Sequence, residues 1–247
     1  MKTKSVIAVF FLLASFAAAN AGTMIDDFET AHSAETTVAA PPTQNVGSVI
    51  NPTLTALGVE RDLFVSKTAG AEDERYRARV NPVGETKLRI DADAQVTGST
   101  FVTWDGVDGN PNPFTGIDYD GLGGVNLIAG ATAFEIVVSF SDIGGDIKFS
   151  VFENTGNSAA DVATATLSIP GGIPADTPTA FQLPFADFTG TTSALSDAGA
   201  ILMEVQNPNG AWDINIQSVQ TVPEPTAFAL AGLGLLMPLA LRRKRSA

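Results

Sequence analysis

Residues 134–140 read Phe-Glu-Ile-Val-Val-Ser-Phe, and residues 147–151 read Ile-Lys-Phe-Ser-Val. In both stretches an apolar side chain occupies every second position, and the positions between them are mostly polar. Alternation with a period of two is typical of an antiparallel strand that has one face on a core and the other in water. The two stretches therefore predict two strands, separated by the glycine-containing connector at residues 142–145. In the first strand Phe134, Ile136, Val138 and Phe140 are expected to face the core.

The same alternation recurs four times toward the C-terminus. Connectors rich in Gly, Pro, Asn and Asp separate the repeats, and no long amphipathic helical pattern lies between them. The sequence therefore predicts an all-β fold, an antiparallel two-sheet β-sandwich of jelly-roll type. The positions expected to face inward are Ala163, Ala165, Leu167 and Ile169, then Phe181, Leu183 and Phe185, then Ile201, Met203 and Val205, and finally Trp212, Ile214 and Ile216.

The first 21 residues have the composition of an export signal. Two lysines precede an apolar run at residues 6–18, and the small-x-small sequence Ala19-Asn20-Ala21 follows it. This pattern predicts a signal-peptide helix at residues 1–21 that signal peptidase removes after Ala21. A cut after Ala19, or retention of the helix as an anchor, is the alternative.

The last 25 residues, 223–247, form a tail in three parts. A Pro-Glu-Pro triplet precedes the apolar segment 227–241, and a basic run follows that segment. As a helix the segment would extend about 22 Å, which is short of a hydrocarbon core of about 30 Å. The tail therefore predicts a short transmembrane helix inserted transiently, with its basic end in the cytoplasm. The residues concerned are Pro223, Glu224 and Pro225, and then Arg242, Arg243, Lys244 and Arg245.

This tail resembles the PEP-CTERM sorting signal. The resemblance is carried by the triplet Pro223-Glu224-Pro225, the apolar segment, the basic end and the presence of a signal peptide. It implies an exosortase as a processing partner, with cleavage near residues 223–225. It also implies export in an exopolysaccharide-producing Gram-negative bacterium, to the cell surface or extracellular matrix, after transient insertion in the inner membrane.

The predicted ectodomain, residues 22–222, resembles the PEP-CTERM ectodomains that look like galactose-binding or carbohydrate-binding jelly rolls. This likeness implies a fold and not a ligand, because function depends on the site. Within the ectodomain, residues 31–58 are rich in Ala, Thr, Pro and Asn and predict a long surface loop. A second loop is expected at residues 105–124. The likeness is carried by Ile25-Asp26-Asp27-Phe28, Arg61-Asp62-Leu63-Phe64-Val65, Gly121-Leu122-Gly123-Gly124 and Trp212-Asp213-Ile214-Asn215-Ile216.

The charge and cysteine content of the ectodomain limit its partners. Residues 22–222 hold 8 of the 14 Lys and Arg residues and 26 of the 27 Asp and Glu residues, which gives a net charge of −18. Such a charge keeps an exported protein soluble and argues against nucleic acid or anionic lipid as a partner. The chain has no cysteine, so its single domain must be held by a hydrophobic core, with or without a metal.

A hairpin is expected around the turn at residues 81–84, with Tyr76, Ala78 and Val80 facing the core. Its outer face would carry five of the eight basic residues of the ectodomain, close enough to repel one another. Either the acidic residues at 72–74, 91 and 93 neutralise this face, or it is a platform for an anionic glycan. The five are Arg75, Arg77, Arg79, Lys87 and Arg89.

The loop at residues 105–124 is dense in side-chain oxygens. Carboxylate and amide oxygens suit Ca²⁺, although the spacing departs from that of an EF-hand. The alternatives are a solvated acidic turn and a second, weaker metal candidate at Asp26-Asp27; apart from Ca²⁺ no cofactor is expected. The candidate ligands in the loop are Asp105, Asp108, Asn110, Asn112, Asp118 and Asp120.

Two aromatic residues accompany this loop. Trp104 precedes it and Tyr119 lies within it, and aromatic rings beside polar groups are a common sugar-binding arrangement. The alternative for Trp104 is that it ends a strand and packs at the rim of the core. Trp212, in phase with Ile214 and Ile216, is expected inside.

The sequence offers little for catalysis. His32 is the only histidine and is expected to be exposed in a loop, and no cysteine nucleophile or Gly-x-Ser-x-Gly sequence is present. The leading hypothesis is therefore a non-catalytic surface or matrix protein, sorted by an exosortase and associated with exopolysaccharide. The alternatives are a carbohydrate-binding module that uses the basic face or the loop at 105–120, and a small glycan-active enzyme.

Overall fold

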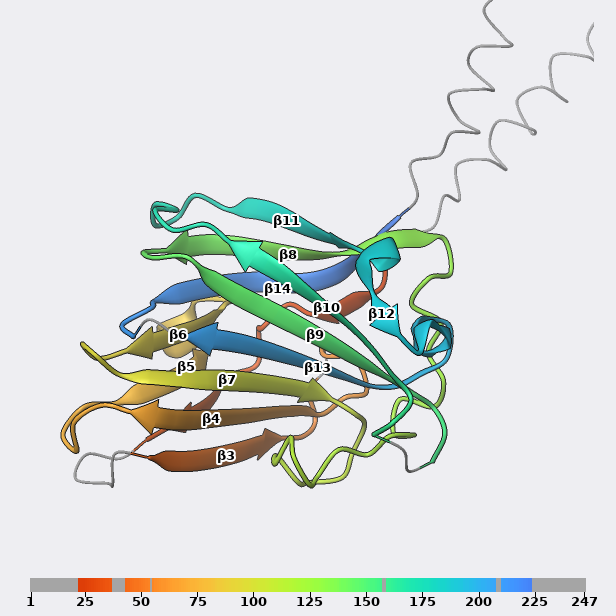
Figure 1. Ribbon diagram of the computed structural model, residues 1–247, viewed down its shortest axis with the longest axis horizontal. Helices are drawn as coiled ribbons and strands as arrows, with labels where there is room; N and C mark the ends of the chain where they lie inside the picture. The colour runs from red at the N-terminus through yellow and green to blue at the C-terminus, as the bar shows by residue number, and fades with distance from the viewer. Residues whose placement is uncertain (1–21, 37–42, 54, 157–158, 208–209, 224–247) are drawn as a thin grey trace, which may run out of the picture.

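Two antiparallel sheets packed face to face make up the part of the chain that the computed structural model describes, which is residues 22–36, 43–53, 55–156, 159–207 and 210–223 (Figure 1). This arrangement confirms the predicted all-β sandwich of jelly-roll type. The predicted signal-peptide helix and C-terminal transmembrane helix lie outside these residues. Within the described residues, no helix has the length and apolar character needed to cross a membrane.

The first sheet has the strand order β11-β8-β14-β6-β5-β2, and β1 pairs with β14 beside this path. All of its pairings are antiparallel. Its strands are β1 (Met24–Asp26), β2 (His32–Glu35), β5 (Tyr76–Val80), β6 (Leu88–Ala92), β8 (Ala131–Ser141), β11 (Thr179–Pro184) and β14 (Ile214–Pro223).

The second sheet has the order β12-β10-β9-β13-β7-β4-β3 and forms the layer in front in Figure 1. Three 3₁₀ turns, η1 (Pro82–Gly84), η2 (Phe185–Asp187) and η3 (Thr192–Leu195), lie in the connections. The strands of the second sheet are β3 (Gln44–Ile50), β4 (Arg61–Ala69), β7 (Thr97–Trp104), β9 (Gly145–Glu153), β10 (Val162–Ile169), β12 (Thr189–Gly190) and β13 (Ala198–Asn207).

The core lies between the two inner faces, where the alternation predicted it. Phe134, Ile136 and Val138 of β8 are fully buried, as are Ile147 and Phe149 of β9. Phe134 stacks on Phe149 with the ring centroids 5.0 Å apart, so the two quoted stretches meet across the sandwich. Phe185, expected in a strand, instead lies in η2, where it remains buried.

The prediction that Phe140 faces inward is wrong. The register between β8 and β14 shifts at this point, with Ile216 opposite Val138 and Asn215 opposite Phe140. The extra residue on β8 inverts the alternation, so that Ser141 is buried and Phe140 is not. Trp212, predicted to lie in the core, is 1% exposed and donates its indole N–H to Ser141 Oγ at 3.0 Å.

The prediction of a long loop at residues 31–58 is also wrong. Strands β2 and β3 lie in this range and form the outermost strands of the two sheets. An edge strand buries few side chains and borrows its backbone hydrogen bonds from one neighbour. A sequence rich in Ala, Thr and Pro can therefore form one without a strong apolar alternation.

A buried charge network joins the two sheets. Asp26 at the end of β1 and Arg61 at the start of β4 are both fully buried, and Arg61 Nη1 lies 3.0 Å from the Asp26 carboxylate. Trp104 Nε1 donates to the same carboxylate at 3.0 Å, and Arg61 Nη2 donates to the Thr30 carbonyl at 2.5 Å. The guanidinium also lies over the Phe28 ring, 5.7 Å from its centroid. The loop after β1 is thereby fixed against the second sheet.

Removing one partner of this pair is expected to destabilise the fold strongly. In the Asp26→Asn variant the Arg61 charge would stay buried without compensation, so the free energy of unfolding should fall by about 3–5 kcal/mol. Urea unfolding measures the change. The double variant Asp26→Asn with Arg61→Met should lose less than the two single variants together. A loss within the about 0.5 kcal/mol of an ordinary surface substitution would contradict this role.

Candidate functional site

Strand pairing places three carboxylates on the outer face of the second sheet. Asp62 in β4 lies opposite Thr103 in β7. Side chains two residues apart share a face of a strand, so Glu60 lies beside Asp62, and Asp105 lies on the same face beyond Thr103. Two neighbouring strand ends therefore bring like charges together, an unfavourable arrangement unless something compensates it.

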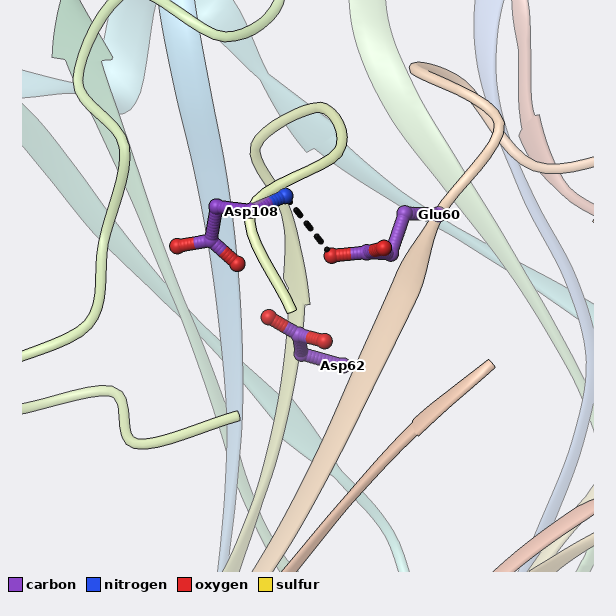
Figure 2. Close-up of side chains that lie close together, drawn as sticks. All are labelled: Glu60, Asp62 and Asp108. Carbon is purple, nitrogen blue, oxygen red and sulfur yellow. Dashed lines mark hydrogen bonds between the residues drawn. The ribbon is translucent and has the colours of Figure 1, made fainter. Parts of the chain in front are cut away.

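The loop that follows β7 adds a fourth carboxylate. Oxygen atoms of Glu60, Asp62 and Asp108 all lie within 4.8 Å of one another, and Figure 2 shows their side chains converging. The Glu60 carboxylate accepts hydrogen bonds from the backbone N–H groups of Asp108, at 3.0 Å, and Gly109, at 2.9 Å. The backbone of the loop is therefore hydrogen-bonded to Glu60, the residue before β4. The Asp108 carboxylate lies beside the carboxylates of Glu60 and Asp62.

Two of these carboxylates are buried and incompletely satisfied. Asp62 is 1% exposed and neither of its oxygens has a hydrogen-bond partner. Burial, with the charges of Asp105, Glu60 and Asp108, raises its pKa to about 8. Asp105 is also 1% exposed; its Oδ2 accepts from the Asp118 N–H at 3.0 Å and its Oδ1 has no partner. Burial is the main cause that raises the pKa of Asp105 to about 7.

The structure divides the six ligands predicted for the loop. Asp105 and Asp108 belong to the cluster. Asn110 and Asn112 instead accept from backbone N–H groups two residues further on, which stabilises local turns. The backbone N–H of Asp118 donates to the Asp105 carboxylate, and the Asp118 carboxylate accepts from the backbone N–H of Asp120. Asp120 itself is exposed.

Sequence reasoning missed Glu60 and Asp62. Their alternation around Arg61 was visible, but only the pairing of β4 with β7 brings them to Asp105.

The second metal candidate, Asp26-Asp27, is wrong. The Asp26 carboxylate already accepts hydrogen bonds from Arg61, from Trp104 and from the backbone N–H of Phe28. The Asp27 side chain caps the N–H of Glu29 at 3.2 Å.

The predicted basic face is present and is neutralised within the sheet. Strands β5 and β6 pair as the hairpin expected, with Arg79 opposite Arg89. Asp91 lies between the cations: its carboxylate is 2.7 Å from Arg77 and 2.8 Å from Arg79, and Arg89 is 3.8 Å away. The remaining pairs are Arg77 with Asp93, Arg75 with Glu35 and Lys87 with Glu85. The cations of this surface are paired with neighbouring carboxylates, so it does not offer a free cationic platform.

The aromatic residues differ from the prediction. Trp104 is fully buried, so it cannot stack on a sugar, and it packs inside the core and not at the rim. Tyr119 is half-buried and contacts Phe152 edge-on, with the ring centroids 5.2 Å apart. Among the described residues, the exposed ring is that of Phe114, which the sequence had not singled out and which is 63% exposed.

Phe114 rests on two other rings of the outer face. Its centroid lies 5.2 Å from that of Phe101 and 5.9 Å from that of Phe64, both edge-to-face. Along the same strand row, Phe101 is opposite Glu204, and Glu204 is opposite Lys148. An exposed ring therefore lies beside a row of polar side chains.

His32 is not the exposed loop residue that the sequence predicted. It begins β2 and is 8% exposed, because alternation turns it toward the interior. Neither ring nitrogen makes a well-formed hydrogen bond, so no serine or carboxylate partner for nucleophilic catalysis is in place among the described residues. Burial, and then the charge of Arg61, lower the pKa of His32 to about 4, and the nearby Ser48 backbone offsets only part of this.

Comparison with known proteins identifies the tail. The PEP-CTERM protein-sorting motif matches residues 221–245. No curated protein matches the chain by sequence.

Solved structures that are similar to this chain match it weakly. The family 11 carbohydrate-binding module from Clostridium thermocellum, in complex with a β-1,3-1,4-mixed-linked tetrasaccharide, is 10% identical, with a TM-score of 0.40 over 83% of this chain and 98% of the module. An exo-β-agarase is 12% identical, with a TM-score of 0.40 over 82% of this chain and 25% of the agarase. Similarities this low assign neither a ligand nor an activity.

The buried histidine predicts a pH dependence of stability. The His32 pKa is about 4 in the folded state, against 6.5 for an unperturbed histidine. Between these values the unfolded chain takes up a proton that the folded chain does not, so folding loses stability as the pH falls through this window. At pH 5 the loss is at most about 2 kcal/mol.

The variant His32→Gln should lack this part of the pH dependence. Urea unfolding of both proteins at pH 7 and pH 5 isolates it, because carboxylate titrations contribute equally to both. Equal changes in the free energy of unfolding for the two proteins would contradict the prediction.

Proposed function

We propose that this chain is an exported, non-catalytic surface protein whose tail is recognised and cut by an exosortase. The observation that carries the proposal is the PEP-CTERM sorting motif at residues 221–245. The motif overlaps the end of β14, which closes at Pro223, so the signal begins where the fold ends. The proposed destination is the cell surface or the surrounding exopolysaccharide matrix.

The fold supports processing at both ends of the chain, because residues near its two ends lie side by side. Strand β1 pairs with β14, the Thr221 N–H donates to the Thr23 carbonyl at 2.8 Å, and the Thr23 N–H donates to Thr221 Oγ1 at 2.7 Å. The predicted signal-peptidase cut after Ala21 and the predicted exosortase cut near residues 223–225 then fall at one end of the sandwich. Only three residues separate Pro223 from the apolar segment, a reach of about 14 Å. This end would therefore face the membrane during processing.

The absence of catalysis is part of the proposal. His32 is buried without a nucleophile, and Glu60 and Asp62 are only 2% and 1% exposed, so neither carboxylate can reach a glycosidic bond. The described residues thus support a binding or structural role.

A second candidate function is the binding of a neutral glycan on the outer face of the second sheet. Phe114 offers the apolar area that a sugar ring covers, held in place by Phe64 and Phe101. Glu204 and Lys148, in the same strand row as Phe101, would supply hydrogen bonds to hydroxyl groups. The charge-balanced basic hairpin is less suited to glycan binding, because its cations are already paired.

Processing predicts a defined mature chain. Protein recovered from the cell surface should begin at Gly22, end near residue 225 and lack Arg242 to Arg245, as intact-mass spectrometry would show. The variant Pro225→Ala should accumulate uncut in the membrane, whereas Pro174→Ala, at an exposed proline between β10 and β11, should be processed normally. Pro223 is left unchanged because it is paired in β14. A mature product that keeps the basic end would overturn the sorting proposal.

Glycan binding predicts a specific loss on removal of one ring. If a glycan array identifies a neutral ligand, Phe114→Ala should weaken its binding by about tenfold or more, because a central aromatic contact is lost. The control is Val83→Ala, which removes an exposed apolar side chain from η1, the turn between β5 and β6 of the first sheet. Equal affinity of Phe114→Ala and the wild type, measured by calorimetry, would exclude this face.

A further inference from the structure

We propose that Glu60, Asp62 and Asp108 bind one Ca²⁺ ion on the outer face of the second sheet, at the base of the loop at residues 105–124. This inference goes beyond the sorting function and does not depend on it. The site would take a hard divalent cation, because every ligand that the cluster offers is a carboxylate oxygen.

The spacing of the oxygens fits one ion. Ca²⁺ binds oxygen at about 2.3–2.6 Å, so two ligands on opposite sides of an ion lie up to about 5 Å apart. Oxygens of Glu60, Asp62 and Asp108 fall within 4.8 Å of one another. Asp105 is also buried and lies on the same face of the sheet, next to this group. Water and loop carbonyls would complete a shell of six to eight ligands.

The satisfaction of the buried carboxylates provides an independent reason for an ion. Asp62 is 1% exposed with both oxygens unpartnered, and its side chain points toward Glu60 and Asp108 in Figure 2. A buried acceptor without a partner costs about 1–3 kcal/mol, and more when it is charged. The ion pairs formed by the described lysines and arginines do not include Glu60, Asp62, Asp105 or Asp108.

A cation here would also fix the loop. The base of the loop is closed by close backbone contact, since a Cβ on Gly106, whose φ is +87°, would lie 2.5 Å from the Gly121 carbonyl oxygen. Asp105 and Asp108 lie on the first part of this loop, and Glu60 and Asp62 on the sheet beneath it. One ion would therefore link loop and sheet and hold the segment that carries Phe114.

The test is a calcium titration of the full chain in mild detergent after treatment with EGTA. At a hundredfold excess over Kd, a ligand that binds only the folded state should raise Tm by about 5–10 °C for a domain of this size. Calorimetry should give one site per chain. Mg²⁺ at the same concentration should give a smaller shift, because it demands a regular octahedral shell.

The variant Asp62→Asn separates an ion site from a merely acidic surface. It should lose the calcium response and, without calcium, melt at or above the Tm of the wild type, because a neutral amide replaces a buried carboxyl group that has no hydrogen-bond partner. Asp108→Asn, at an exposed position that does not endanger folding, should weaken calcium binding at least tenfold. The control Asp187→Asn makes the same charge change at an exposed site in η2 and should respond like the wild type.

Two results would overturn the proposal. The first is a wild-type Tm and titration heat that do not respond to millimolar calcium. The second is a response of equal size in the wild type and in Asp108→Asn. Neither result would affect the processing of the tail, which is read from the mass of the mature chain.

Discussion

The ion pair between Arg61 and Asp26 is the constraint around which the sandwich is built. A guanidinium and a carboxylate that are both fully removed from water can remain charged only while they stay together. Their partners come from both sheets, because β1 belongs to one and β4 and β7 to the other. Trp104 donates to the same carboxylate, so the largest side chain of β7 is oriented by the charge that fixes β1. Neither sheet can shift without unpairing a buried charge.

Asp62, the residue that follows Arg61, has no cation to pair with among the described residues. Arg61 points into the sandwich and Asp62 points out of it, since successive side chains of a strand alternate. The inner carboxylate, Asp26, has a dedicated cation, whereas the outer one, Asp62, meets only other acidic groups. Residues 22–222 carry a net charge of −18 and contain only eight Lys and Arg residues. Five of these eight already form ion pairs in and around the hairpin of β5 and β6. The proposed Ca²⁺ ion would compensate the charge of this outer cluster.

The sequence predicted what depends on local alternation and failed where pairing decides. Strands β8, β9, β10, β11, β13 and β14 were all expected, because each buries one face on the core. Phe140 was misplaced because a bulge inverted the phase, and only the partner strand reveals a bulge. Strands β2 and β3 were missed because edge strands bury little. The cluster of Glu60, Asp62, Asp105 and Asp108 was half-predicted, since Glu60 and Asp62 are separated from the loop by more than 40 residues and meet it only through the register of β4 and β7.

The position of the sorting motif follows from the topology of the first sheet. Strand β14 is paired with β8, β6 and β1, so it is an interior strand and the last to be made. The sheet cannot close until residues 214–223 have been delivered, and a cut within them would expose the backbone groups of three neighbouring strands. A cut beyond Pro223 breaks none of these pairings. The join between fold and tail therefore allows the tail to be removed from a sandwich that is already complete.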